Sequence, residues 1–179
     1  CIGAENKVKS VLLLSDVPLN KIETILLDYQ SKTSVNLVKV LAQQYWKITP
    51  KWIQSTLGYE IKIKEKTAGV IIGDRTFKLN KTYKYTYDLA EEWRKFTGLP
   101  FVFACWVANK KLPINFVKAF NLALKNGVQN IDNVINLYNE NNISKTILKS
   151  YLQNNISYTL DKNKLKAIEL FHSYLLINN

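Results

Sequence analysis

Three hydroxyl side chains and a lysine occupy residues 30–35 (QSKTSV), immediately before a segment with helical spacing. The hydroxyls belong to Ser31, Thr33 and Ser34. The start of a helix has unpaired backbone N–H groups and the positive end of the helix dipole, so it can hold a carboxylate or a phosphate. These residues are therefore candidates for binding an anion. The alternative is that Ser31 or Thr33 only caps the helix.

A second group of candidate ligand-binding residues stands at the end of a buried apolar run, where the sequence reads Gly73-Asp74-Arg75. Gly73 would let the backbone come close to a ligand, because it has no Cβ. Asp74 would then lie at the rim of the site, unless it only forms a surface ion pair with Arg75. Ser10, on a predicted strand at residues 8–15, joins this group if that strand borders the ligand.

Alternating strands and helices must position these candidates in the first two-thirds of the chain. Apolar runs predict strands at residues 8–15, 25–27, 52–56, 67–73, 83–87 and 101–108. Helices are predicted at 33–46 and 88–96, the second with Asp88 as its cap and Gly98 at its end. This alternation predicts an α/β fold with a parallel or mixed sheet. Ligands of such sheets bind outside the carboxyl ends of the strands, next to helix starts.

The last part of the chain has a different pattern. Helical spacing predicts four helices, at residues 113–127, 130–139, 144–154 and 162–177. Hardly any strand candidate lies among them, although their apolar faces must be buried against something. The sequence therefore predicts a second lobe that is short of its own strands.

The formal net charge of +11 comes from 25 basic and 14 acidic side chains. The excess is spread along the chain, with +6 in residues 1–108 and +5 in residues 109–179. Lysine supplies 23 of the 25 basic side chains, whereas recognition of phosphate and bases favours arginine. A general richness in Lys and Asn explains the charge better than a nucleic-acid-binding face does. The diffuse positive field would still attract a small anion.

The two cysteines and the single histidine indicate no metal site and no Cys/His catalytic pair. Cys105 lies in an apolar run and is predicted to be buried and unreactive. The longest apolar run has eight residues, which is too short to span a membrane. Cys1 leaves open a solute-binding lipoprotein acylated at that residue. Since the sequence has no Met, we also expect that chain preceding Cys1 is absent.

Several motifs together resemble one family. The sequences SVLLLSDVP, DYQSKTSV, AGVIIGDRTF, YDLAEEW and TGLPFVFACWVAN are similar to chorismate dehydratase of the futalosine route to menaquinone. The resemblance implies a cytoplasmic hydro-lyase that converts chorismate to 3-[(1-carboxyvinyl)oxy]benzoate without a metal or cofactor, and it leaves a homodimer open. It also implies a two-lobed fold like that of type II periplasmic binding proteins, with the N-terminal part of lobe 1 missing.

On that fold, residues 1–12 would be the first crossover between the lobes with a remnant of lobe 1. Residues 13–103 would form the complete lobe 2, and residues 104–179 the second crossover with the helical remainder of lobe 1. The strands at 8–15 and 101–108 would be the crossovers themselves. The cleft would be lined by the candidate substrate-binding residues Ser10, Ser31, Thr33, Ser34, Gly73 and Asp74. The resemblance assigns no catalytic residue.

A sibling family of similar fold, 1,4-dihydroxy-6-naphthoate synthase, is the other enzyme to consider. That family resembles this chain but carries a His-Glu pair at the end of the strand that corresponds to residues 69–72. Here the same place reads Gly73-Asp74, and the only histidine is His172 in the last predicted helix. The difference favours the dehydratase.

Overall fold

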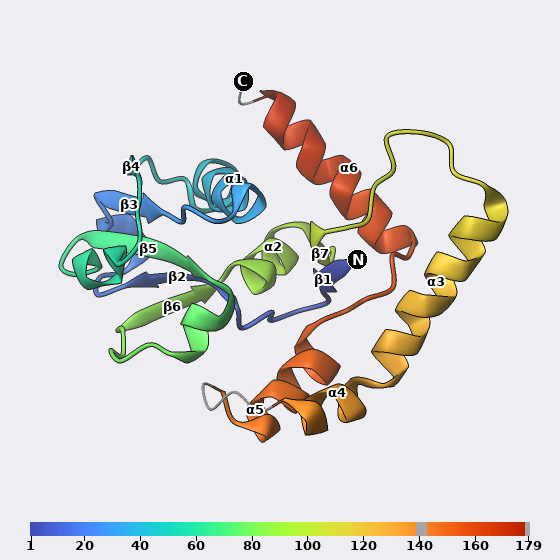
Figure 1. The fold of residues 1–179 in the computed structure, drawn as a ribbon. Coiled ribbons are helices and arrows are strands. Elements are labelled where there is room, and N and C mark those ends of the chain that lie inside the picture. Colours follow the sequence, from blue (N-terminus) through green and yellow to red (C-terminus); the bar gives the residue numbers. More distant parts are fainter. Residues whose placement is uncertain (139–142, 178–179) are drawn as a thin grey trace.

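A five-stranded mixed sheet forms the centre of the structure, which is a computed structural model that describes residues 1–138 and 143–177. The strand order is β4-β3-β5-β2-β6 (Figure 1). The strands are β2 (Val11–Ser15), β3 (Thr24–Leu27), β4 (Lys51–Gln54), β5 (Thr67–Ile72) and β6 (Tyr85–Asp88). Strand β2 runs antiparallel to both of its neighbours, and β3 runs parallel to β4 and β5. The predicted α/β fold with a mixed sheet is therefore confirmed.

A second, two-stranded sheet is formed by β1 (Ile2–Ala4) and β7 (Phe101–Ala104), which pair antiparallel. The strand predicted at residues 8–15 is shorter than expected, since it begins at Val11, and it lies inside the five-stranded sheet. It begins there because Lys9 has a left-handed backbone, with φ at 64°, which lies outside the extended conformation of a regular strand. The partner of β7 is the three-residue strand β1, which the sequence pattern did not predict.

Helices cover one face of the larger sheet. Helix α1 (Lys32–Val40) continues as a π-helical segment, η2 (Leu41–Trp46), and α2 (Leu89–Thr97) contacts β2 and β6. The cap of α2 is Asp88, and Gly98 ends the helix at φ 73°, as predicted. Helix α6 (Lys162–Ile177) packs on α1 and β7. The main core lies between these elements and includes Leu13, Ile25, Val70 and Trp93.

A smaller core covers the opposite face of the sheet, where the short 3-10 helix η3 (Tyr59–Lys62) packs on β5. Neighbouring residues of one strand serve the two cores in turn, because successive side chains of a strand point to opposite faces. Leu13 lies in the main core and Leu14 in the smaller one. Two further 3-10 helices, η1 (Leu19–Lys21) and η4 (Gly73–Phe77), follow β2 and β5.

The last part of the chain is helical, as predicted. Its elements before α6 are α3 (Ile114–Gln129), α4 (Ile131–Leu137), α5 (Lys145–Ser150) and the π-helical segment η5 (Tyr151–Asn155). The predicted helix end at residue 139 lies outside the described residues. Helix α3 stands apart from the larger sheet and contains no buried residue (Figure 1). Its exposed apolar side chains, Phe116 and Leu122 among them, agree with the expectation that this helix lacks a sheet to cover.

We expect the substitution Gly3→Ala to destabilise the pairing of β1 with β7. A Cβ at Gly3 would lie 2.9 Å from the carbonyl oxygen of Phe101, and Gly3 also exchanges backbone hydrogen bonds of 3.0 and 2.8 Å with Ser157. Because the obstructing atom is backbone, the strands must separate, and we expect the free energy of unfolding to fall by about 1–3 kcal/mol. Urea denaturation followed by circular dichroism measures this change.

The matched control is Gly127→Ala on helix α3, where an added Cβ would meet nothing within 4 Å. An alanine in an open helical position should raise the free energy of unfolding by about 0.5–1 kcal/mol. Two changes of the same sign and size would contradict the assignment of Gly3 to a close approach between strands.

Candidate functional site

All the candidate binding residues lie at one edge of the five-stranded sheet. The carboxyl ends of β3, β4 and β5 share this edge with the amino end of antiparallel β2, since Val11 pairs with Ile72. The residues that flank this pair are also joined, because the backbone N–H of Gly73 donates to the carbonyl oxygen of Ser10 at 2.8 Å. The loop that follows β3 leads at the same edge into α1. The topology therefore brings together candidates that are far apart in the sequence.

Ser31 is the N-cap of α1, which confirms for this residue the alternative of a capping role. Its Oγ accepts the backbone N–H of Ser34 at 3.0 Å and donates to the Ser34 hydroxyl at 2.9 Å. Ser34 itself is buried. These two hydroxyls shape the start of the helix. The remaining N–H groups of the first turn have no acceptor within the helix and are suited to an anion.

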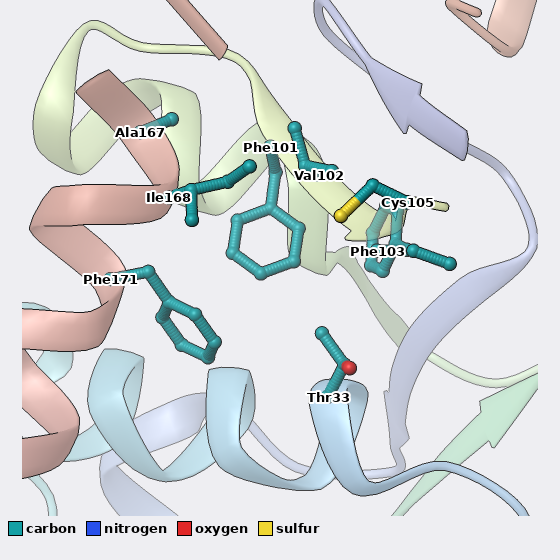
Figure 2. A pocket seen from close by; sticks show the side chains of 9 residues that line it. Thr33, Phe101, Val102, Phe103, Cys105, Ala167, Ile168 and Phe171 are labelled. Carbon is teal, nitrogen blue, oxygen red and sulfur yellow. The ribbon is translucent and has the colours of Figure 1, made fainter. Parts of the chain in front are cut away.

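Thr33 does not cap the helix but lines a pocket of about 280 Å³. Figure 2 shows its side chain pointing into the space between α1, β7 and α6. The other lining residues are Phe101, Val102, Phe103, Ala104, Cys105, Ala167, Ile168 and Phe171. Almost all of them are apolar, so the pocket suits a ring or another apolar group that lies beside an anion held by α1.

Cys105 is exposed at this pocket, so the prediction of a buried thiol was wrong. The apolar run that contains it was expected to remain a strand as far as residue 108. Strand β7 instead ends at Ala104, and Trp106 and Val107 are exposed as well. An apolar residue is buried only where another element covers it, and the chain beyond β7 forms a loop.

Ser10 lies buried at the start of β2, where its Oγ is 2.8 Å from the hydroxyl of Tyr151. Tyr151 begins η5 and so brings the C-terminal part of the chain to the sheet edge. The ring of Phe77 packs edge-on against the ring of Tyr151, with 5.1 Å between the ring centres. Burial raises the pKa of Tyr151, and the nearby negative charge of Asp74 adds to this effect. Tyr151 therefore keeps its proton at neutral pH and can donate a hydrogen bond. The sequence pattern did not point to this residue.

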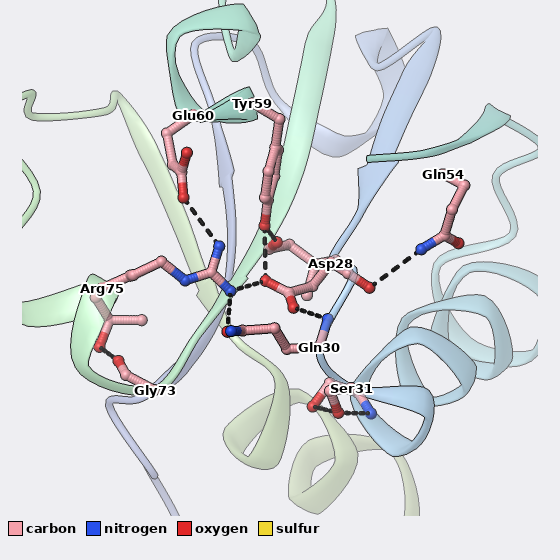
Figure 3. A network of polar contacts seen from close by, with 11 residues as sticks. Asp28, Gln30, Ser31, Gln54, Tyr59, Glu60, Gly73 and Arg75 are labelled. Atoms are coloured by element: carbon pink, nitrogen blue, oxygen red, sulfur yellow. Dashed lines mark hydrogen bonds and ion pairs between the residues drawn. The ribbon is translucent and has the colours of Figure 1, made fainter. Parts of the chain in front are cut away.

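Asp28 is the centre of a buried polar network beside α1 (Figure 3). Its side chain is 0% exposed. One carboxylate oxygen accepts the backbone N–H of Gln30 at 2.8 Å, and the other accepts the hydroxyl of Tyr59 at 2.9 Å and an N–H of Arg75. Burial raises the pKa of Tyr59, and the Asp28 carboxylate raises it further. Tyr59 therefore keeps its proton at neutral pH, and its hydroxyl has two acceptors within reach, the Asp28 carboxylate and the backbone carbonyl oxygen of Val70.

Arg75 turns inward to this network, so the plain alternative of a surface pair with Asp74 was wrong. Besides Asp28, its guanidinium donates to Glu60 at 2.9 Å and to the side-chain oxygen of Gln30 at 3.1 Å. Asp74 is left exposed at the turn after β5. Sequence reasoning missed the pairing of Asp28 with Arg75. The available signal was that charged residues follow two buried strands: Asp28 comes directly after β3, and Arg75 is the third residue after β5.

A mixed sheet with helices defines an α/β protein, and its helix start and small apolar pocket lie at the carboxyl ends of the strands, where sheets of this kind bind ligands. No helix in the described part of the chain is both long and apolar enough to cross a membrane. A protein family described as menaquinone biosynthesis matches residues 1–176. The chain belongs to this family and is an enzyme of that pathway. The match agrees with the resemblance found in the sequence motifs.

Proposed function

We propose that the protein is a hydro-lyase that removes water from chorismate to give 3-[(1-carboxyvinyl)oxy]benzoate. The observation that supports it best is the combination of the α1 start with the pocket that Thr33 enters. Chorismate is a dianion built on a six-membered carbon ring. A carboxylate at the first turn of α1 would leave the ring beside the aromatic side chains of β7 and α6. The +11 net charge would favour the approach of such an anion.

The proposed reaction needs little from the protein beyond orientation. A ring proton leaves, the bond between the ring and its hydroxyl breaks, and the hydroxyl departs as water. The ring becomes aromatic, which supplies the driving force. Thr33 and the free N–H groups of α1 hold a carboxylate in this proposal, and Ser10 donates a hydrogen bond to the substrate. Asp74 and Gly73 line the site without an assigned role. The elimination uses no metal or organic cofactor, and the proposal assigns no residue as the base.

The proposal includes a two-lobed arrangement like that of type II periplasmic binding proteins. Residues 13–103 would be one lobe, residues 1–12 and 104–179 would contribute the crossovers and part of the other, and the substrate would lie between them. The pairing of β1 with β7 supports this arrangement, because the chain enters and leaves the five-stranded sheet there. The contact between Ser10 and Tyr151 supports it as well, since it joins residues 1–12 to residues 104–179, the two segments that would form the crossovers and the other lobe.

The decisive experiment incubates the protein, produced from its complete reading frame, with chorismate and follows the aromatic product by chromatography. The absence of product from a folded sample would overturn the proposal. Intact mass of the native protein tests the lipoprotein alternative, since a diacylglycerol adduct on Cys1 would contradict a cytoplasmic enzyme. A nanomolar, salt-sensitive complex with DNA or RNA would instead support a nucleic-acid binder. Sedimentation would show whether the enzyme is a homodimer.

We expect Thr33→Val to raise the KM for chorismate while it leaves the fold intact. Valine keeps the shape of the side chain but cannot hydrogen-bond a buried anion, and the loss should weaken binding by about 1–3 kcal/mol. Steady-state kinetics measure this change. Thr146→Val on α5 is the matched control, because Thr146 is exposed. Equal KM values for the two variants would return Thr33 to a purely structural role.

A further inference from the structure

We propose that Arg75 is a positioning residue for the substrate site. Its side chain holds the start of α1 at a fixed distance from the turn after β5. This inference rests on the proposed function for its kinetic consequence. Arg75 belongs to η4, the turn that also contains Gly73 and Asp74. Its guanidinium reaches Asp28 and Gln30, which precede the Ser31 cap in the loop after β3. One side chain therefore joins two loops of the site.

The contacts of Arg75 use its fork geometry. One terminal nitrogen donates to Asp28 and to Gln30, and the other donates to Glu60 at 2.9 Å (Figure 3). The guanidinium also lies over the ring of Tyr29, 5.0 Å from the ring centre. A lysine would carry the same charge but has one ammonium group on a flexible stem, so it cannot hold these partners together.

The charge of Arg75 is also needed for folding, and the test must separate that need from positioning. The Asp28 side chain is completely buried and that of Arg75 is 23% exposed. Removal of a cation from such a pair leaves a buried carboxylate without its partner, which is strongly destabilising. A substitution that removes only Arg75 would therefore lower stability whatever the role of the residue. Replacing Asp28 at the same time removes the unpaired charge.

Displacement of Arg75 would disturb both sides of the site. The turn of Gly73 is held to Ser10 by one backbone hydrogen bond, and Thr76 in the same turn donates to the carbonyl oxygen of Gly73 at 2.8 Å. On the other side, the loop of Gln30 leads directly to the N-terminus of α1. Binding of the substrate should therefore weaken, because the two loops that carry the binding groups would have to be ordered when the substrate binds.

The experiment compares Arg75→Lys and the double variant Asp28→Asn/Arg75→Met with the wild type, all produced from the complete reading frame. We expect Arg75→Lys to raise the KM for chorismate at least tenfold, with kcat changed less than threefold. The double variant, which has no unpaired buried charge, should have a thermal stability close to that of the wild type but should keep the raised KM. Lys81→Met is the control, since Lys81 pairs with Asp16 in the same part of the chain and should leave the KM unchanged.

Amide hydrogen exchange supplies a readout that needs no substrate. We expect exchange at residues 29–34 to be at least tenfold faster in both Arg75 variants than in Lys81→Met, while the amides of β2 and β5 are unaffected. This result in a protein that does not turn over chorismate would support the positioning role and refute only the proposed function. Unchanged exchange, or a KM that recovers together with stability in the double variant, would overturn the positioning role.

Discussion

Replacement of Trp93 by alanine should lower the free energy of unfolding by about 3–5 kcal/mol, the usual cost of a large cavity in a core. Trp93 is 0% exposed, and its indole N–H donates to the carbonyl oxygen of Pro100 at 3.1 Å. Its ring meets Phe101, Phe171 and Tyr174 edge-on, at centre distances of 5.4, 5.8 and 6.3 Å. These contacts join α2 to β7 and α6, so the loss of one side chain separates three elements.

Urea denaturation followed by far-ultraviolet circular dichroism measures this effect without relying on tryptophan fluorescence. Trp106→Ala is the matched control, because Trp106 is 73% exposed and its ring contacts that of Phe120, on the exposed helix α3. Its removal should change the free energy of unfolding by no more than about 0.5 kcal/mol. Comparable losses in the two variants would contradict the assignment of Trp93 as the residue that holds these elements together.

The substitution Trp93→Ala should also affect the candidate site. Phe101 and Phe171 contact Trp93 on one side and line the apolar pocket of Thr33 on the other. A cavity at Trp93 would let both rings move away from the pocket. We therefore regard Trp93 as a support of the pocket, although Trp93 does not itself line it.

Local signals in the sequence predicted most of the elements correctly. Asp88 and Gly98 marked the two ends of α2 because a cap and a left-handed glycine act within a few residues. Strand β1 had no such signal, since three residues are too few for a periodic pattern and its partner β7 lies about one hundred residues away. The start of β2 was placed too early because the left-handed conformation of Lys9 depends on contacts made elsewhere in the chain.

The site was predictable to the extent that its residues obey local rules. Helix starts and strand ends can be found from the sequence, and α/β topology brings them to one edge. The partners that fix them are not local: Arg75 is 47 residues from Asp28, and Tyr151 is 141 residues from Ser10. No spacing rule relates such positions. Candidate binding residues were therefore found, whereas the residues that position them required the structure.

Asp88 combines a predicted role with an unpredicted one. The capping role is local, since its carboxylate accepts the N–H groups of Ala90 and Glu91 at 3.1 and 3.3 Å. The same carboxylate also accepts the backbone N–H groups of Val8 and Lys9, at 3.2 and 2.7 Å. These two long-range bonds hold the chain in the turn that precedes Ser10. Asp88 thus links the start of α2 to the amino end of β2 at the edge where the site lies.

We therefore expect Asp88→Ala to lower the free energy of unfolding by about 2–4 kcal/mol, more than the loss of a cap alone, because four N–H groups lose a charged acceptor. Asp88→Asn should lose less, since an amide oxygen can still accept two of these bonds. The exposed Asp132, in the first turn of α4, provides the control, and Asp132→Ala should cost at most about 1 kcal/mol.

Amide exchange at Val8 and Lys9 distinguishes the long-range role of Asp88 from simple capping. If the carboxylate holds this segment, exchange at both amides should become much faster in Asp88→Ala, and the effect should extend to Ser10. A loss of stability with protection at Val8 and Lys9 unchanged would mean that Asp88 only caps α2. In the structure, the Lys9 N–H donates to Asp88 at 2.7 Å, and we attribute the left-handed backbone of Lys9 to this bond. Unchanged protection in Asp88→Ala would mean that another contact holds Lys9 in that conformation.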